Sequence, residues 1–192
     1  MAIMQKHKIK VDGHGEVPEP IETFEKMQKA YGWSESFMRR LKENECIKPT
    51  PVQIQAIPVL FAKKSSVVLA ETGSGKSLAF IAPLLHMIKH GDGLKAVVLS
   101  PTRELTIQLY KEFLIFSGAG GSSAIKTPRV KFLRKALFPT TQAQFDQLIS
   151  TTEILIASPL KLAQLVEKYP LTSLSYLIVD EADKLCEMGF LE

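Results

Sequence analysis

The residues best suited to chemistry lie in one stretch, Ala70-Glu71-Thr72-Gly73-Ser74-Gly75-Lys76-Ser77. The β-branched segment Val67-Val68-Leu69 comes directly before it and predicts a buried parallel strand. An apolar run that predicts a helix comes directly after it. A strand, a tight glycine-bearing loop and Gly-Lys-Ser at a helix start form a cradle for phosphate groups. We therefore predict a phosphate loop, in which Gly73 and Gly75 free backbone N–H groups and the helix dipole attracts the anion.

Two side chains of this loop would act on a bound nucleotide. Lys76 is placed as a point charge for the β- and γ-phosphates, and the Ser77 hydroxyl can ligate Mg²⁺. Ala70 stands where the generic pattern has its first glycine. Since a strand and a helix flank the loop as the pattern requires, we prefer this interpretation to an incidental lysine in a glycine-serine turn.

A second group of chemical residues follows a later apolar run, Tyr176–Val179, which predicts a strand. It consists of Asp180-Glu181-Ala182-Asp183. Nucleotide hydrolysis needs one carboxylate to hold Mg²⁺ and another to orient water, and we assign these roles to Asp180 and Glu181. Adjacent acids on a turn are common, but together with the phosphate loop they indicate nucleotide hydrolysis with Lys76, Asp180 and Glu181 as catalytic residues.

A capped helix upstream offers a group that could recognise a base. Thr50 is a natural N-cap and Pro51 suits the first helical position, so Gln53 lies in the first turn. Its amide can read both edges of a base because it offers a donor and an acceptor together. Taken alone, this segment is a weak signal.

The elements that must position these residues alternate along the chain. A helical pattern covers residues 21–45, and polar segments such as the glycine- and serine-rich loop 117–128 connect the elements. The apolar runs that predict strands are 67–69, 96–99, 130–133, 154–157 and 176–179. Because helical patterns separate the strong strands, the sequence predicts an α/β fold with a parallel sheet covered on both faces.

Composition limits the class of protein. The chain of 192 residues suffices for one α/β domain, which we place at residues 21–192 behind an extended polar leader at 1–20. Its 24 Lys and Arg against 20 Asp and Glu give a charge of +4, which permits nucleic-acid binding without arguing strongly for it. The two cysteines lack partner spacing, which fits a reducing compartment and argues against a disulfide framework or zinc site.

The histidines, the longest apolar runs and the N-terminus give no sign of a metal site, a membrane span or a signal peptide. We interpret His7, His14, His86 and His90 as surface or linker residues because they show no ligand spacing. No run reaches the length of a transmembrane helix, and the N-terminus lacks the apolar core of a signal peptide.

Five motifs together resemble those of DEAD-box ATP-dependent RNA helicases in order and spacing. They are Pro49–Gln53, Ala70–Ser77, Pro101–Leu105, Ser158–Lys161 and Asp180–Asp183. The resemblance covers residues 24–192 and implies an N-terminal RecA-like ATP-binding domain, truncated at its C-terminal end and without the second RecA-like domain. The leader and the long spacer after Phe24 resemble the Rok-type branch, which serves rRNA processing and small-ribosomal-subunit assembly in the nucleolus.

The resemblance implies a role for each site residue, with ATP and Mg²⁺ as the ligands. Phe24 would stack on adenine and Gln53 would read its edge. The phosphates would contact Thr72, Gly73, Ser74, Gly75, Lys76 and Ser77, and Ser77 and Asp180 would hold Mg²⁺. The RNA sugar-phosphate backbone would be gripped by Thr102, Arg103, Ser158 and Lys161. Contacts to the backbone alone would make RNA binding sequence-independent and salt-sensitive.

The same resemblance implies partners and a place in the cell. RNA would be the main partner, with pre-ribosomal RNA as its expected source and ribosome-assembly proteins beside it. The chain would be a monomer without membrane contact, in the nucleus or nucleolus, and otherwise cytoplasmic.

Departures from the family pattern shape the expected activity. Glu45-Cys46 stands where the family has Gly-Phe, and Ser77 and Ser158 stand where it has threonines. Lys161 replaces an arginine, and a lysine cannot bind a phosphate with two parallel hydrogen bonds as an arginine does. The Ser-Ala-Thr motif and the arginine fingers are missing, and such a finger is worth roughly 10³–10⁵ in rate. We therefore expect nucleotide binding with very slow turnover and no unwinding.

Two other interpretations stay open at this point. One is another P-loop NTPase that acts on DNA or drives transport, against which Gln53 and the Asp-Glu-Ala-Asp tetrad argue. The other is a non-catalytic truncated product that binds RNA or assembly partners. RNA binding that depends on ATP would support the helicase interpretation over the first alternative.

Overall fold

The computed structural model describes residues 2–13, 15–118, 128–133 and 137–190. The chain forms two compact units, residues 1–87 and 88–192, which we describe in turn. In the part of the chain that the structure describes, no helix is both long enough and apolar enough to cross a bilayer.

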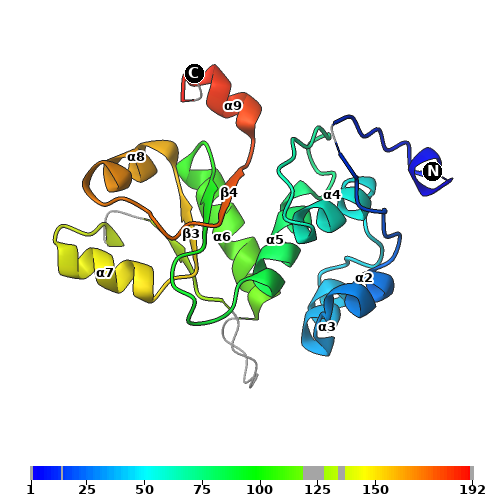
Figure 1. Ribbon diagram of the computed structural model, residues 1–192, viewed down its shortest axis with the longest axis horizontal. Helices are drawn as coiled ribbons and strands as arrows, with labels where there is room; N and C mark the ends of the chain where they lie inside the picture. Colours follow the sequence, from blue (N-terminus) through cyan, green and yellow to red (C-terminus); the bar gives the residue numbers. More distant parts are fainter. Residues whose placement is uncertain (1, 14, 119–127, 134–136, 191–192) are drawn as a thin grey trace. The chain divides into compact units, whose positions relative to one another are not determined.

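Unit 1, residues 1–87, is helical in its described part (Figure 1). Its helices are α1 (Ala2–Lys6), α2 (Phe24–Tyr31), α3 (Glu35–Glu43), α4 (Pro51–Phe61) and α5 (Lys76–Met87). The helical pattern expected over residues 21–45 is thus two helices. Gly32 separates them, because its left-handed conformation (φ 68°) ends α2, and Ser34 then caps α3 by accepting a hydrogen bond from the backbone N–H of Phe37.

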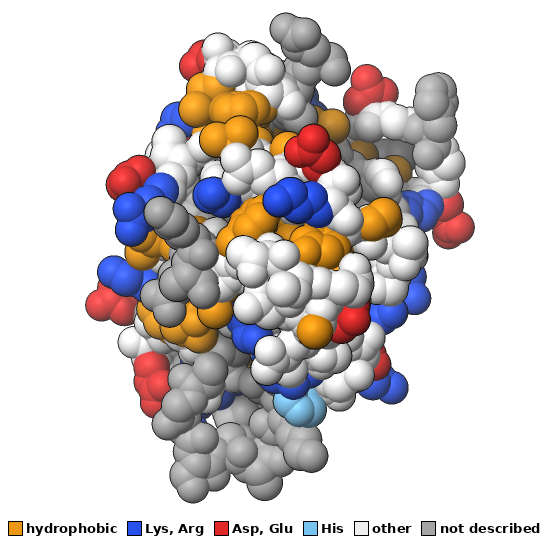
Figure 2. All heavy atoms as spheres, turned by 90° about the vertical axis from the view of Figure 1, so that its left-hand side faces the viewer, with side chains coloured by type: hydrophobic (Ala, Val, Ile, Leu, Met, Phe, Trp, Pro, Cys, Tyr) orange, Lys and Arg blue, Asp and Glu red, His pale blue; other side chains and the backbone are white. Residues whose placement is uncertain are grey.

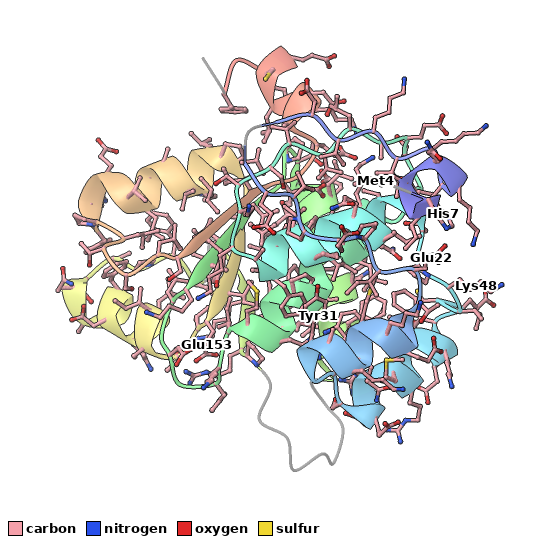
Figure 3. All side chains as sticks on the ribbon, turned by 45° about the vertical axis from the view of Figure 1, so that its right-hand side comes forward. Met4, His7, Glu22, Tyr31, Lys48 and Glu153 are labelled. Atoms are coloured by element: carbon pink, nitrogen blue, oxygen red, sulfur yellow. The ribbon has the colours of Figure 1, made fainter. Side chains whose placement is uncertain are left out.

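The leader is only partly extended. Its first residues form α1, and the Glu22 carboxylate accepts hydrogen bonds from Lys6 (2.9 Å) and His7 (3.0 Å), which lower the pKa of Glu22 (Figure 3). Further along, the side-chain amide of Gln55 on α4 donates to the carbonyl oxygen of Pro18 at 2.9 Å. The leader is therefore tied to the helices of unit 1, and a separate leader segment stays a prediction.

His86 is part of an aromatic cluster, so its assignment to the surface or a linker was wrong. The imidazole stacks on Trp33 with ring centroids 5.3 Å apart and meets the ring of Phe37 edge-on at 4.6 Å. Its Nδ1 donates to the carbonyl oxygen of Ala82 at 2.7 Å. Burial lowers the pKa of His86. The apolar pattern of α5 could not show this, because the partners come from α3 and the turn before it.

The expected buried strand at Val67–Leu69 is also wrong in this structure. Val67 is 89% exposed and Leu69 is 92% exposed, and residues 64–70 have no regular secondary structure. An apolar β-branched run has strand propensity, but a strand forms only where a neighbouring strand accepts and donates its backbone hydrogen bonds. Among the described residues, none pairs with this segment.

Unit 2, residues 88–192, contains a parallel sheet with the order β2-β3-β1-β4 (Figure 1). The strands are β1 (Ala96–Leu99), β2 (Val130–Phe132), β3 (Ile154–Ala157) and β4 (Tyr176–Val179). The helices are α6 (Arg103–Ser117), α7 (Gln142–Ser150), α8 (Pro159–Lys168) and α9 (Ala182–Glu187). These four strands confirm the strand predictions downstream of the phosphate loop.

The connections place helices on both faces of this sheet. The crossover from β1 to β2 runs in one direction along the sheet, and those from β2 to β3 and from β3 to β4 run in the other. Because parallel crossovers are right-handed, α6 covers one face while α7 and α8 cover the opposite face. A core cluster agrees with this, since Phe145 of α7 and Leu165 of α8 pack together with Val97 and Leu155 of the sheet. The predicted α/β fold is confirmed.

An ion pair between the buried Glu153 and the partly exposed Arg129 connects segments at the amino edge of the sheet. The Glu153 side chain is fully buried and accepts hydrogen bonds from the backbone N–H of Arg129 (2.6 Å), its guanidinium group (2.5 Å) and the N–H of Gly91 (3.0 Å) (Figure 3). Burial alone would raise the pKa of Glu153, but the hydrogen bonds from Arg129 and Gly91 hold it below its ordinary value. This carboxylate therefore joins β2, β3 and the turn before β1.

Candidate functional site

The phosphate loop in unit 1 has the conformation that its glycines predict. Gly73 (φ 80°) and Gly75 (φ 83°) lie in the left-handed region, and α5 begins directly afterwards at Lys76. The Lys76 ammonium group bends back over the loop and donates to the carbonyl oxygens of Ala70 (2.6 Å) and Glu71 (2.8 Å). An ammonium group held against the loop in this way is positioned for an anion that the loop encloses.

Gln53 connects this loop to helix α4. The side chain is 4% exposed, its Oε1 accepts from the backbone N–H of Thr50 at 3.0 Å, and its Nε2 donates to the carbonyl oxygen of Gly75 at 3.0 Å. Sequence reasoning missed the bond from the Thr50 N–H to Gln53, although a Thr followed three residues later by Gln is the signal of a capping box. The amide is engaged on both sides, and its reading of an adenine edge stays a prediction.

A side chain at Gly75 would force the Gln53 amide to move. A Cβ built there would lie 2.4 Å from the Nε2 of Gln53 and 3.3 Å from the side chain of Thr50. A Cβ at Gly73 would meet nothing within 4 Å. The two glycines thus share a backbone conformation, but only Gly75 is required by close approach of another element.

The residues of the loop fit a nucleotide with its Mg²⁺. The hydroxyl oxygen of Ser74 is buried and has no hydrogen-bond partner among the described residues. A buried hydroxyl without a partner is costly, so it marks a place where a polar ligand would be accepted. The Ser74 hydroxyl and the ammonium group of Lys76 are donors that suit phosphate oxygens, and the hydroxyl of Ser77 on the first turn of α5 suits Mg²⁺.

Phe24 lies in the core of unit 1. It is 2% exposed, begins α2, and its ring centroid is 6.2 Å from that of Trp33. A ring with so little exposed surface supports the helix packing first, and its stacking on adenine stays a prediction.

In unit 2 the remaining candidates converge on one edge of the sheet. Leu99 at the end of β1 is in register with Ala157 of β3 and with Val179 of β4. Since the three strands are parallel neighbours, the segments that follow them emerge at the same carboxyl edge. The candidates on these segments are Thr102, Arg103, Ser158, Lys161, Asp180 and Glu181. The connection from β1 runs toward β2 and the connection from β3 runs toward β4, and ligands of open α/β sheets bind outside the carboxyl ends of the strands.

The two predicted helix caps at this edge differ in their contacts. Thr102 caps α6, and its hydroxyl accepts from the backbone N–H of Leu105 at 3.3 Å. Ser158 caps α8, but its hydroxyl makes no such bond. Arg103 is the first residue of α6 and is exposed, whereas Lys161 is half-buried in the first turn of α8.

The acidic residues follow β4 directly. The backbone N–H of Asp180 donates to the carbonyl oxygen of Leu99 at 3.0 Å and so extends the ladder beyond the strand. Glu181 adopts a left-handed conformation (φ 50°, ψ 51°), which is uncommon for a residue with a side chain and is concentrated at functional sites. Its carboxylate lies 2.5 Å from the Lys184 ammonium nitrogen, and this hydrogen bond raises the pKa of Lys184.

Sequence reasoning missed Lys184 as a partner of Glu181, although the spacing of three residues at a helix start was visible.

The predicted catalytic residues lie in different units. Lys76 and Ser77 belong to unit 1, whereas Asp180 and Glu181 belong to unit 2. Their joint action on one nucleotide stays a prediction.

Comparison with known proteins gives consistent results. Residues 50–192 match the DEAD/DEAH box helicase family. The chain is 36% identical to the probable ATP-dependent RNA helicase DDX52 of Rattus norvegicus over 96% of this chain and 30% of that protein. It is 33% identical to the ATP-dependent RNA helicase ROK1 of Lodderomyces elongisporus over 97% of this chain and 34% of that protein.

A solved structure shows the same fold. The yeast DEAD-box splicing factor Prp28 superposes with a TM-score of 0.76 and 27% identity, over 99% of this chain and 45% of that one. The chain spans about a third of the length of the two curated relatives above. The match over most of the chain, together with the phosphate loop and the Asp-Glu-Ala-Asp segment, shows that the chain belongs to the DEAD/DEAH box helicase family.

Proposed function

We propose that this chain binds ATP with Mg²⁺ and the sugar-phosphate backbone of RNA, as the N-terminal RecA-like domain of an ATP-dependent RNA helicase. The geometry of the phosphate loop carries the nucleotide part of the proposal. Left-handed glycines, the ammonium group of Lys76 and the buried Ser74 hydroxyl, which has no hydrogen-bond partner among the described residues, all belong to this loop in unit 1. The names of the relatives support ATP as the nucleotide and RNA as the polymer.

The proposed roles follow from the chemistry of each side chain. Lys76 neutralises phosphate charge, the oxygens of Ser77 and Asp180 hold Mg²⁺, and Glu181 orients or activates the attacking water. Phe24 and Gln53 complete an adenine site in this proposal. For the RNA backbone, the proposed contacts are Thr102, Arg103, Ser158 and Lys161.

The test is ATP binding and hydrolysis by residues 1–192, with and without single-stranded RNA. Lys76→Ala is expected to weaken ATP binding at least about tenfold, since it removes the only charge we assign to the phosphates. Glu181→Gln is expected to keep ATP binding and lose hydrolysis. Lys168→Ala at the end of α8 changes the net charge equally and serves as the control.

Two results would contradict this proposal. ATP binding by Lys76→Ala as tight as that of the unmodified chain would remove the phosphate loop from the mechanism. Binding of RNA to Lys76→Ala and to the unmodified chain with no dependence on ATP would favour a non-catalytic RNA-binding product.

We also propose a cellular role in rRNA processing and assembly of the small ribosomal subunit, in the nucleolus. The likeness to the protein named ROK1 and the resemblance of the leader support this role. Ultraviolet crosslinking of the tagged protein in cells should recover precursor rRNA and assembly proteins, and fluorescence should place it in the nucleolus. Recovery of messenger RNA without precursor rRNA would contradict this assignment.

A further inference from the structure

Lys161 has two defined contacts in the first turn of α8. Its ammonium nitrogen donates to the Oε1 of Gln164 at 3.0 Å and lies 5.3 Å from the ring centroid of Phe138. The second distance is within the range of a cation–π interaction. The four-carbon stem of a lysine is flexible. The two contacts at the end of the Lys161 side chain therefore restrict the positions that its charge can occupy.

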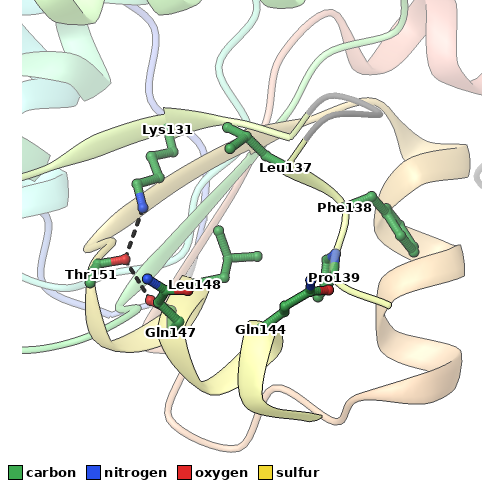
Figure 4. Close-up of a pocket in the computed structure, with 8 residues that line it drawn as sticks. All are labelled: Lys131, Leu137, Phe138, Pro139, Gln144, Gln147, Leu148 and Thr151. Atoms are coloured by element: carbon green, nitrogen blue, oxygen red, sulfur yellow. Dashed lines mark hydrogen bonds between the residues drawn. The ribbon is translucent and has the colours of Figure 1, made fainter. Parts of the chain in front are cut away.

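Phe138 is itself held in place. Its ring is partly buried and packs against the core cluster of the face covered by α7 and α8, which includes Leu148 and Leu165. Figure 4 shows the ring turned away from Lys131, at the rim of a pocket of about 290 Å³. Lys131 is engaged elsewhere, because its ammonium group donates to the Thr151 hydroxyl at 2.8 Å. Phe138 therefore offers its ring face to Lys161 from a fixed position.

The ammonium group keeps the capacity to bind a phosphate in this arrangement. It has three N–H donors, of which the contact with Gln164 uses one, and the contact with Phe138 is made to the face of the ring. Lys161 is half-buried and its helix starts at the carboxyl edge of β3. On the face that carries α7 and α8, Figure 2 shows Lys and Arg side chains among apolar ones.

We propose that Phe138 and Gln164 are positioning residues, which hold the Lys161 ammonium group ready for an RNA phosphate. This inference rests on the proposed role of Lys161 in RNA binding. Holding the lysine in advance reduces the rotamer entropy that is lost when the phosphate binds. Neither Phe138 nor Gln164 contacts RNA in this arrangement, and both act through Lys161.

The test measures binding of a labelled single-stranded oligouridylate to residues 1–192 across a series of salt concentrations. Lys161→Ala is expected to lower the slope of log K against log salt by about 0.7, which corresponds to one phosphate contact on a single strand. Lys168→Ala, on the same helix, is the control of equal charge. Phe138→Leu is expected to weaken binding about two- to five-fold and to lower the slope, and Phe138→Tyr to restore both. Gln164→Ala is expected to act in the same direction.

A double mutant separates positioning from general damage. If Phe138 acts through Lys161, Phe138→Leu has no further effect on binding when Lys161→Ala is already present. Additional weakening in that background, or unchanged binding and slope in Phe138→Leu alone, would overturn the inference. Tighter binding by Phe138→Leu would overturn it as well, since the ring would then keep Lys161 away from RNA.

The proposed function fails in a different way. Unchanged binding in Lys161→Ala relative to Lys168→Ala would remove Lys161 from the RNA contacts, whatever Phe138 does. Weakened binding in Lys161→Ala with unchanged binding in Phe138→Leu would refute only the positioning role.

Discussion

At the scale of single residues, Gln53 and Gly75 depend on each other. The Gln53 amide reaches from the first turn of α4 to the Gly75 carbonyl oxygen, and a Cβ at position 75 would lie 2.4 Å from that amide. Gly73 has almost the same backbone conformation and no such neighbour. Substitutions at Gly73 and Gly75 can therefore distinguish the free-energy cost of a left-handed backbone from the cost of a steric clash.

We expect Gly73→Ala to lower the free energy of unfolding by about 1–2 kcal/mol, the cost of the left-handed conformation for a residue with a Cβ. Gly75→Ala should lower it further and weaken ATP binding more strongly, because Gln53 must move. Urea unfolding and ATP titration measure the two effects. Adding Gln53→Ala to Gly75→Ala should recover part of the lost stability. Equal losses in the two alanine variants would show that the contact with Gln53 is unimportant.

At the scale of elements, the two helix starts at the carboxyl edge are stabilised differently. Thr102 closes the first turn of α6 through its hydroxyl, whereas the Ser158 hydroxyl makes no cap bond to α8. The proline at the first position of α8 stabilises the start of this helix without a cap bond, because its φ is already helical. The Ser158 hydroxyl is therefore not needed for the helix.

Thr102→Ala should lower the free energy of unfolding by about 1 kcal/mol, a typical loss for an N-cap, and Thr102→Ser should restore it. Ser158→Ala should change it by less than about 0.5 kcal/mol. Thermal or urea unfolding provides the measurement. A loss for Ser158→Ala as large as that for Thr102→Ala would mean that the Ser158 hydroxyl caps α8 in solution.

Residues 67–69 give a second prediction at this scale. Because these residues are exposed and outside the sheet, their amide hydrogens should exchange with solvent at nearly the rate of an unfolded chain. The amides of β1 are paired on both sides and should be protected. Hydrogen exchange of residues 1–192 compares the two segments directly. Protection of Val67–Leu69 equal to that of β1 would show that this segment has a strand partner in solution.

At the scale of the whole molecule, the two units have different acid-sensitive groups. In unit 1, the folded pKa of His86 lies below its ordinary value of 6.5, so the unfolded chain takes up the proton first. Its contribution to stability is present above pH 6.5 and is lost as pH falls below that value. In unit 2, the folded pKa of Glu153 lies below 4.5, so its contribution is lost only as pH falls below 4.5.

As pH falls, the free energy of unfolding of unit 1 should therefore decrease at a higher pH than that of unit 2. Trp33 is the single tryptophan and stacks on His86, so its fluorescence reports on unit 1. Between pH 6.5 and 4.5, the unfolding midpoint followed by Trp33 should fall in the unmodified chain and stay nearly constant in His86→Phe. A pH-independent midpoint in the unmodified chain would contradict the assigned role of His86.

Glu153→Gln tests the other unit. It should lower the free energy of unfolding of unit 2 by about 1.5–3 kcal/mol at neutral pH, because a neutral amide replaces the charged acceptor of the hydrogen bonds from Arg129 and Gly91. The loss stays below that of a fully buried ion pair, because the Arg129 side chain is 35% exposed and water can solvate its charge. Amide exchange in β3 follows this loss, and an unchanged rate would show that the ion pair contributes little.

The sequence by itself determined the local features of this protein. Gly73, Gly75 and Lys76 defined the phosphate loop, the apolar runs defined the four strands of unit 2, and Thr102 capped its helix as expected. These features depend on residues close together in the chain, through backbone conformation, side-chain periodicity and hydrogen bonds to the next turn. The order of the motifs was likewise sufficient to indicate the helicase family.

Only the tertiary structure decided the contacts between distant residues. It left Val67–Leu69 unpaired, packed His86 against Trp33 and placed Lys161 on the ring of Phe138. Periodicity shows that a segment has an apolar face or strand propensity, but it does not show which segment covers or pairs with it. That choice depends on packing and on hydrogen bonds across the fold, because a strand, a buried ring or a held charge exists only together with its partner.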